Sequence, residues 1–263
     1  MRDLLSIGTS RGCEMIGTGI GLGLSGYMLN SPWNPTKLDG LKFWIDASDS
    51  STLYTDSTLT TLAVADGDPV GGWKDKSTLG LNLTQSDSLY KPALRFSRQN
   101  GRPGVNFGEK VMKTAVTTAI SFPTIFLVAK NTTYTNALPY LFDNPTTNNL
   151  VLYTAQSDSK LYFDAGTTLA SSNATTLGTA FQTTLKLSNP RTSSELRINA
   201  VSTTGSVGNA NWAGFTLGSP GHNNASPYKL DGDIYEILVY NSPLSSPNIL
   251  LVEAYLKTKW GTP

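Results

Sequence analysis

The 263-residue sequence is poor in the two residue types that most often carry chemistry. It contains one cysteine, Cys13, so no disulfide can form within the chain and the fold must be stabilised by its core. It also contains one histidine, His222. With a single histidine, the sequence cannot supply a multi-histidine zinc site and gives little support to a serine–histidine–aspartate arrangement. The default interpretation is a buried thiol for Cys13 and a solvated loop residue for His222.

Charged residues are also scarce, at 15% of the sequence, where soluble domains usually have about 25%. Lysine and arginine number 20 and aspartate and glutamate 19, and no basic run or patch is present. We therefore expect no nucleic-acid partner, because phosphate binding depends on clustered cations. Threonine, serine, asparagine and glycine take the place of the missing charges, and they suit strands and turns.

Long apolar runs are missing as well. The only candidate for a membrane or signal segment, residues 15–29, contains too many glycines to span a bilayer. Asp3, Arg11 and Glu14 make a poor start for a signal peptide. The sequence therefore predicts neither a signal peptide nor membrane insertion.

Residues 1–37 differ in composition from the rest of the chain. They are rich in glycine, serine and methionine, and glycines alternate with apolar residues that include Ile16, Ile20, Leu22 and Leu24. A segment of this kind cannot build a core alone. We expect an extended assembly or anchoring arm that becomes ordered against a partner; a free tail is the alternative.

Residues 38–263 carry the pattern of an all-β domain. Two runs rich in β-branched and aromatic residues, 230–240 and 124–130, indicate central strands that are buried on both faces. Short segments separated by turn residues predict further strands, and this spacing is typical of a sandwich or barrel. The further strands are expected at 41–46, 58–65, 81–84, 92–96, 105–107, 140–142, 150–154, 161–163, 181–188, 195–200 and 215–218.

One helix is expected, at the C-terminal end of the chain. Ser245 and Pro247 provide a start signal, and Ile249, Val252, Leu256 and Trp260 recur at helical spacing. The predicted architecture is therefore an antiparallel β-sandwich with one C-terminal α-helix and an N-terminal arm.

Seven segments in order resemble a known family. They are Leu41-Lys-Phe-Trp-Ile-Asp-Ala-Ser-Asp49, Asp66-Gly-Asp-Pro-Val-Gly-Gly-Trp-Lys-Asp-Lys-Ser77, Lys91-Pro-Ala93, Asn100-Gly-Arg-Pro-Gly-Val-Asn-Phe107, Thr124-Ile-Phe-Leu-Val128, Asp231-Gly-Asp-Ile-Tyr-Glu-Ile-Leu-Val-Tyr240 and Val252-Glu-Ala-Tyr-Leu-Lys-Thr-Lys-Trp-Gly261. Together they resemble the laminin-G-like, concanavalin A-like lectin/glucanase jelly rolls of bacteriophage virion proteins and bacterial surface proteins. The resemblance covers about residues 38–261, and it implies two antiparallel sheets packed face to face.

The resemblance also implies a setting. It favours a non-enzymatic protein of the virion surface, which is either a capsid decoration or head fibre, or a tail fibre or adhesin. Such a protein is made in the host cytoplasm, and we expect it to dock on other virion proteins through residues 1–37. A homo-oligomer, most simply a trimer, is expected for phage components of this type. A bacterial cell surface is the alternative location. A carbohydrate-binding module for host recognition, contacting a host-surface glycan, and a glycan hydrolase are the alternative functions.

The hydrolase alternative rests on Asp231, Asp233 and Glu236. Glycanases that the chain resembles use Glu-x-Asp-x-x-Glu on one strand, and retaining hydrolysis needs two carboxyl groups about 5–5.5 Å apart. Here the first acid is an aspartate, and without a bulge positions 231 and 236 point to opposite faces of a strand. We therefore expect no catalytic residues here and a single paired glutamate in a strand.

Two kinds of binding site remain as candidates. Acidic loops containing Asp66, Asp68 and Asp143 could hold Ca²⁺, since laminin-G-like domains often hold one at a sandwich rim, but ordinary turns use the same residues. No other cofactor is expected. A sugar-binding site needs exposed aromatic side chains on which a sugar ring can pack, with amide groups beside them. Trp44 and Trp73 are not counted as candidates, because we interpret them as core residues between the sheets. The candidates for the sugar site are Trp212, Tyr134, Tyr153, Asn144 and Asn148.

Overall fold

The computed structural model describes residues 33–146, 149–221 and 226–263. Contacts divide the chain into Met1–Trp33 and Asn34–Pro263, and only the second unit is described below. Most of the segment expected to be an arm, together with Cys13, His222 and Asn148, lies outside the described residues. Pro35, in the 3-10 turn Pro35–Lys37, is buried and its carbonyl accepts a hydrogen bond from the Tyr240 hydroxyl at 2.9 Å, so this residue of the expected arm packs with the sandwich.

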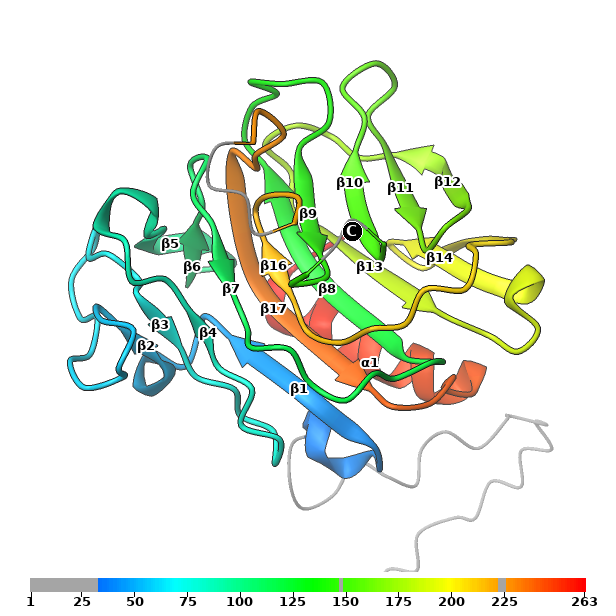
Figure 1. Ribbon diagram of the computed structural model, residues 1–263, viewed down its shortest axis with the longest axis horizontal. Helices are drawn as coiled ribbons and strands as arrows, with labels where there is room; N and C mark the ends of the chain where they lie inside the picture. The colour runs from blue at the N-terminus through cyan, green and yellow to red at the C-terminus, as the bar shows by residue number, and fades with distance from the viewer. Residues whose placement is uncertain (1–32, 147–148, 222–225) are drawn as a thin grey trace, which may run out of the picture. The chain divides into compact units, whose positions relative to one another are not determined.

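Two antiparallel sheets face each other in the described part of the chain, which confirms the predicted all-β sandwich (Figure 1). Sheet A consists of β15 (Val201–Gly205), β14 (Ser194–Ile198), β13 (Phe181–Lys186), β8 (Thr124–Asn131), β17 (Gly232–Tyr240), β6 (Arg102–Asn106) and β5 (Ala93–Gln99) in spatial order, with β1 (Leu41–Asp46) paired to β17. Sheet B consists of β12 (Thr168–Ala174), β11 (Lys160–Asp164), β10 (Val151–Thr154), β9 (Tyr140–Asp143), β16 (Thr216–Leu217), β7 (Met112–Lys113), β4 (Leu83–Thr84), β3 (Gly72–Trp73) and β2 (Leu53–Tyr54).

Strand β17 lies at the centre of sheet A, as its apolar run predicts. All nine of its residues are buried, and it pairs with β8 along its whole length. Its partner β1 points Phe43 toward sheet B, where the ring lies 5.1 Å from that of Phe215 just before β16. A strand with no exposed residue needs covering layers on both faces, and sheet B supplies one of them.

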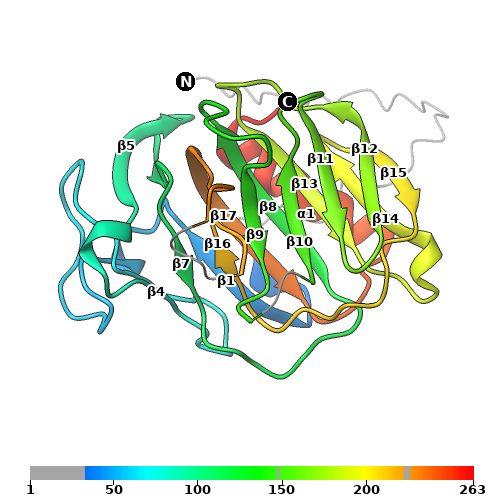
Figure 2. The ribbon, with the colours of Figure 1, turned by 45° about the horizontal axis from the view of Figure 1, so that its top comes forward.

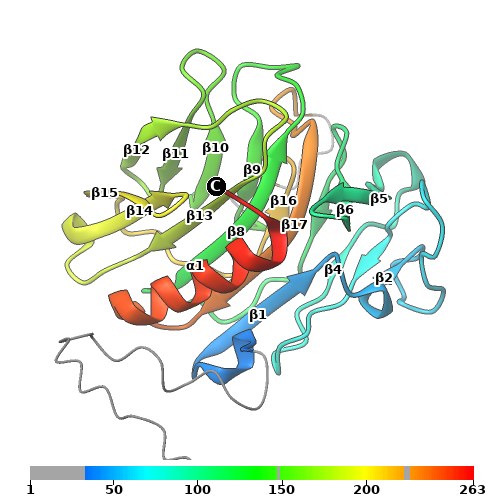
Figure 3. The ribbon, with the colours of Figure 1, turned by 180° about the vertical axis from the view of Figure 1, so that it is seen from behind.

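Helix α1 (Ser246–Trp260) supplies the other layer. Figure 3 shows it lying across the face of sheet A that is turned away from sheet B. Its buried side chains are Ile249, Val252, Glu253, Leu256 and Trp260, and it ends at Gly261 in the left-handed conformation (φ 64°) that glycine adopts without strain. The expected helix is therefore confirmed, although the Ser245 side chain makes no capping hydrogen bond. In the described residues, no helix is both long and apolar enough to span a bilayer.

Several strand predictions differ from the structure in their extent, and two of them have a clear physical reason. Residues 58–65 form a loop apart from an isolated bridge at Leu62, because the Asp56 carboxylate accepts backbone N–H groups of Thr58 (2.9 Å) and Thr61 (2.8 Å). The strand expected at 195–200 ends at Ile198, because residues 199 and 200 have positive φ and make a two-residue hairpin turn. Strands β12 and β15, rich in serine, threonine and glycine, were not predicted.

Candidate functional site

The carboxylate of Glu236, which carried the hydrolase alternative, lies in a closed network beneath α1. It has no exposed surface. It accepts hydrogen bonds from the indoles of Trp44 (2.8 Å) and Trp260 (2.6 Å) and from the Tyr255 hydroxyl (2.8 Å). Lys259 lies 2.8 Å from it as a counter-ion. Every acceptor position of this carboxylate is occupied, as a buried charge requires.

The same network contains Asp46. Lys259 lies 2.7 Å from Asp46 and Lys76 lies 3.1 Å from it, and together these cations lower the pKa of Asp46 although burial opposes them. Burial, reinforced by the nearby charge of Asp46, raises the pKa of Glu236. Trp44, expected in the core between the sheets, is buried but faces this network. The network joins β1, β17 and α1.

The other acids of the motif have separate partners. Asp233 is fully buried and pairs with Arg98 (3.0 Å) and Lys130 (3.0 Å), whereas Asp231 precedes β17 and accepts from the Thr133 hydroxyl. Strand β17 does carry a bulge between Ile234 and Glu236, so simple alternation does not hold along it. Even so, each acid is engaged by its own set of residues, and no pair faces a common cleft in the described structure.

The three acids considered for Ca²⁺ are not gathered in one place. Asp66 pairs with Arg95 (3.3 Å), and Asp68 accepts from the backbone of Val64 and Ala65 (2.8 Å each). Asp143 is buried at the end of β9. Among the described residues, no group of three or more aspartate, glutamate, histidine or cysteine side chains could hold a metal ion. The structure therefore does not bring Asp143 together with Asp66 and Asp68.

A row of stacked tyrosines crosses sheet B. Tyr153 and Tyr162 lie 5.3 Å apart with ring planes at 6°, and Tyr140 stacks on the other side of Tyr153 at 5.4 Å and 20°. Tyr228, from the segment before β17, stacks on Tyr140 at 6.3 Å and 26°. We call these four residues the tyrosine ladder. Cross-strand pairing between β9, β10 and β11 aligns three of them directly.

The tyrosine ladder lies on the face of sheet B that is turned away from sheet A. Residues next to it in the strands, Leu152 and Phe163, are fully buried, and Leu169, the cross-strand partner of Phe163, reaches Gly205 of sheet A. Because successive side chains alternate between faces, the tyrosines point outward. Strands β9 to β12 form the front layer in Figure 1, and the tilted view of Figure 2 shows the same layer.

The tyrosine ladder has polar neighbours and two open ends. Asp158 accepts from the Tyr162 hydroxyl at 2.8 Å, and the Lys160 backbone N–H, together with this hydroxyl, lowers the pKa of Asp158. Ala170 is the cross-strand partner of Tyr162, so only a methyl group faces the end of the row. At the other end Tyr228 is 40% exposed. The outer face of sheet B therefore carries the aromatic rings of the tyrosine ladder and the ionised Asp158 carboxylate side by side.

Buried Asp143 lies at the edge of this surface. Its carboxylate accepts from the backbone N–H groups of Asn144 and Gly221, both at 2.7 Å, and no counter-ion is within reach among the described residues. Burial raises the pKa of Asp143 to about 7, against the opposing effect of these hydrogen bonds. Burial and the charge of Asp143 raise the pKa of Tyr140 to about 12, so the Tyr140 hydroxyl keeps its proton and remains a donor.

Of the residues predicted for a sugar site, one joins the tyrosine ladder and two are buried. Tyr153 is the second ring of the ladder. The expectation that Trp212 is exposed was wrong: it has no exposed surface and packs 5.4 Å from Phe215. Asn144 is also buried, and its amide is bound to the Asn211 carbonyl at 2.9 Å. Tyr134 is half-buried with an unpartnered hydroxyl and makes no stacking contact with the ladder, and Asn148 lies outside the described residues.

The other three tyrosines of the ladder were not predicted. The signal in the sequence is weak: Tyr153 and Tyr162 each follow a buried leucine in a short alternating strand. Tyr140 takes its place through a bulge in β9, and Tyr228 arrives from a loop far along the chain. The strand register brings Tyr140, Tyr153 and Tyr162 together, and tertiary packing of the loop adds Tyr228.

Solved structures share the fold but little of the sequence. Trypanosoma rangeli sialidase in complex with sialic acid is 12% identical with a TM-score of 0.57, and the match covers 84% of this chain and 33% of the sialidase chain. The binding domain of Paraclostridial Mosquitocidal Protein 1 is 12% identical with a TM-score of 0.57, covering 86% of this chain and 56% of that chain. This chain therefore spans about a third of the sialidase chains it matches. The likeness supports the concanavalin A-like sandwich predicted from the sequence.

A weaker likeness is to the Ruminococcus gnavus IT-sialidase CBM40 bound to alpha2,3 sialyllactose, with 20% identity and a TM-score of 0.43 over 51% of this chain and 83% of that chain. No protein-family model and no curated protein matches the sequence.

Proposed function

We propose that the domain is a non-enzymatic carbohydrate-binding module that holds a glycan on the tyrosine ladder. The observation that carries the proposal is the stack of four outward-facing rings across β9, β10, β11 and the segment before β17. Four aligned aromatic side chains on the outer face of a sheet provide more apolar surface than an ordinary exposed strand does.

Sugars suit this surface chemically. A pyranose ring has an apolar C–H side that packs against aromatic carbon, and hydroxyl groups that need charged or planar partners. The free side of the Tyr162 ring, next to Ala170, can pack against the C–H side of the sugar. The carboxylates of Asp158, in the turn before β11, and Asp164, at the end of β11, can accept hydrogen bonds from the sugar hydroxyl groups.

The neighbours' descriptions point the same way. The mosquitocidal protein's domain is described as a binding domain, and the Trypanosoma rangeli sialidase is in complex with sialic acid. Similarity of fold alone does not transfer a ligand, so the proposal depends on the tyrosine ladder.

Two features favour binding without catalysis. Glu236 is enclosed by two indoles, a hydroxyl and an ammonium group, so it has no free oxygen to offer a substrate. The ladder's own acids are tied to local donors: Asp158 to the Tyr162 hydroxyl, and Asp164 to the Gly166 backbone N–H at 2.6 Å. Release of reducing sugar from a bound polysaccharide would contradict this part of the proposal.

The motifs shared with phage virion jelly rolls favour a setting on a virion surface, with residues 1–37 as the anchor and a trimer as the assembly. Deleting residues 1–34 leaves the sandwich residues intact. The truncated protein should fold and bind glycan but should no longer enter particles; normal incorporation would contradict the anchoring role.

A glycan panel tests the binding function. Wild-type protein should bind at least one polysaccharide, and Tyr153→Ala should weaken that binding about 5-fold or more, because it removes the central ring on which Tyr140 and Tyr162 stack, and such contacts contribute about 1 kcal/mol each. Phe96→Ala is the matched control, because Phe96 is an aromatic residue that is 48% exposed on β5 of sheet A. Equal losses for both variants, or no binding by wild type, would overturn the proposal.

A further inference from the structure

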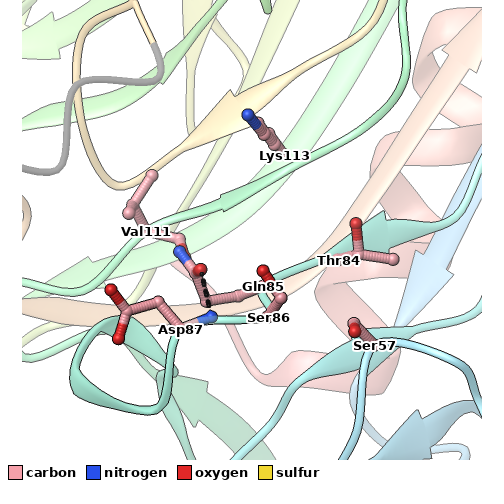
Figure 4. A pocket seen from close by; sticks show the side chains of 7 residues that line it. All are labelled: Ser57, Thr84, Gln85, Ser86, Asp87, Val111 and Lys113. Atoms are coloured by element: carbon pink, nitrogen blue, oxygen red, sulfur yellow. Dashed lines mark hydrogen bonds between the residues drawn. The ribbon is translucent and has the colours of Figure 1, made fainter.

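Beside the tyrosine ladder, sheet B holds a polar hollow of about 340 Å³. Strands β4 and β7 and the loops around them form its walls (Figure 4). Six of its seven lining side chains are polar, and one of them is a lysine. The lining residues are Ser57, Thr84, Gln85, Ser86, Asp87, Val111 and Lys113.

The walls of the hollow are fixed by internal hydrogen bonds. Gln85 donates its amide to the Val111 carbonyl at 2.9 Å, and its amide oxygen accepts from the Asp87 backbone N–H at 3.0 Å. Asp87 in turn accepts from the Leu89 N–H at 3.0 Å and caps the 3-10 turn Ser88–Tyr90. These residues are preorganised, so a ligand would not have to order them.

The remaining polar groups have no protein partner. Within the described residues, neither the Lys113 ammonium nor the hydroxyls of Ser57, Thr84 and Ser86 make a hydrogen bond or an ion pair. Two lysines of sheet A are paired with acids, Lys130 with Asp233 and Lys186 with Glu195. An unpaired ammonium group and free hydroxyls in the lining of one hollow are suited to an anion that also carries hydroxyl groups.

The hollow opens on the same face as the tyrosine ladder. Met112 and its cross-strand partner Leu217 are fully buried toward the core, so Lys113 points outward by alternation. Lys113 pairs with Thr216, which pairs with Asp143 on β9. With neighbouring strands about 4.8 Å apart, β7 lies about 10 Å from β9 across the sheet.

Contacts also connect the two places directly. Tyr228, at the end of the ladder, is followed by Lys229, whose ammonium lies 5.1 Å from the ring centre of Tyr90. The Tyr90 carbonyl accepts from the backbone N–H of Val111, which lines the hollow, at 3.1 Å. An oligosaccharide that reaches from the tyrosine ladder to Lys113 must therefore pass over Thr216 and Asp143, whose side chains have no exposed surface.

We propose that the hollow at Lys113 is a subsite for an acidic sugar, so that the module prefers polysaccharides carrying carboxylate or sulfate groups. This inference rests on the proposed carbohydrate-binding function. Lys113 pairs with the acidic group, and the hydroxyls of Ser57, Thr84 and Ser86 together with the free oxygen of Asp87 hold the sugar hydroxyls. The tyrosine ladder binds the rest of the chain.

The test compares acidic polysaccharides with their neutral forms. Polygalacturonate, alginate, hyaluronate and polysialate are titrated against the full chain, each together with its carboxyl-reduced form. Chondroitin sulfate is titrated together with its desulfated form, its carboxyl-reduced form and the neutral form that carries both modifications. Wild type should bind at least one acidic polymer about 10-fold more tightly than its neutral form at low salt, and the preference should shrink as salt is added. A carboxylate or a sulfate as the recognised group is told apart by which modification removes binding.

Variants at Lys113 separate this inference from the proposed function. Lys113→Gln should remove the preference, while Lys113→Arg should keep most of it and Lys257→Gln, on the exposed side of α1, should change nothing. If Tyr153→Ala abolishes binding but Lys113→Gln leaves the preference for acidic polymers intact, the proposed subsite at Lys113 is wrong, while the proposed carbohydrate-binding function still stands. If wild type binds neutral and acidic forms equally, the subsite is also wrong. If it binds no polysaccharide at all, both proposals fail.

Discussion

The two faces of the molecule use aromatic and acidic residues in opposite ways. Beneath α1, two indoles, a tyrosine hydroxyl and Lys259 surround Glu236, and every polar atom finds a partner inside the protein. On the outer face of sheet B, the tyrosines contact one another and leave their edges to solvent. Complete internal pairing indicates a structural role, and incomplete pairing at a surface indicates a binding role.

The largest loss of stability is expected in the network beneath α1, where every polar atom has a partner. Glu236→Gln replaces a carboxylate with an amide whose NH₂ group faces indole and hydroxyl donors, and it removes one of the two carboxylates that pair with Lys259, leaving Asp46. Unfolding by urea should show a loss of about 3–5 kcal/mol, typical of breaking a buried ion pair. The matched control is exposed Glu109→Gln, which should stay within about 0.5 kcal/mol. A small loss at Glu236 would mean that the network is not structural.

Asp143 sharpens the comparison, because among residues 33–146, 149–221 and 226–263 no cation pairs with this buried carboxylate. Its pKa is raised to about 7, so the folded state favours the protonated form. Its contribution to stability is therefore full below about pH 4 and is lost as the pH rises to 7, at up to about 1.4 kcal/mol per pH unit.

Asp143→Asn should flatten the dependence of unfolding free energy on pH between 4 and 7, a difference of about 3 kcal/mol from wild type over that range. The variant also loses one acceptor for the Gly221 and Asn144 N–H groups, so it should be less stable than wild type at pH 4. Parallel pH profiles for the two proteins would contradict the burial of an unpaired charge here.

The tyrosine ladder should contribute less to stability than to binding. Tyr153→Ala removes a half-exposed ring with a neighbour on each side, and we expect a loss of about 1 kcal/mol in unfolding free energy. Tyr153→Phe keeps the stack and should be close to wild type. A loss of 3 kcal/mol or more for the alanine variant would place the ladder with the structural network instead.

The smallest change in stability is expected at Tyr162, the end of the tyrosine ladder on β11. Tyr162→Phe removes the hydrogen bond to Asp158 at 2.8 Å, which is exposed to solvent, so stability should change by about 0.5 kcal/mol or less. The pKa of Asp158 should rise in this variant, because the hydroxyl helps to lower it. NMR titration of the Asp158 carboxyl carbon measures the shift, and an unchanged pKa would show that the hydrogen bond is not formed in solution.

The sequence predicts the scaffold well, because periodicity is a local property. The apolar run of β17, the alternation of β14 and the helical spacing of α1 all appear within single segments. The hairpin turn at residues 199 and 200 was missed because an asparagine–alanine pair is a weak turn signal.

The candidate site depends on relations that no segment contains. Trp212 lies among asparagines and glycines that suggest a surface loop, yet its backbone pairs with Ile120 and its ring fills the space beside Phe215. The tyrosine ladder needs the register of three strands, a bulge in β9 and a loop from far along the chain. Hydrogen-bond register and tertiary packing, rather than propensity, decide both outcomes.

Tyrosine NMR tests the central claim most directly, since the same residue type occurs on both faces. With ring-labelled tyrosine, titration with an acidic polysaccharide that wild type binds should shift the resonances of Tyr140, Tyr153, Tyr162 and Tyr228. Tyr235, Tyr240 and Tyr255, which lie on the α1 side of sheet A, should not move. Shifts confined to these last three, with the tyrosine ladder unchanged, would contradict the account.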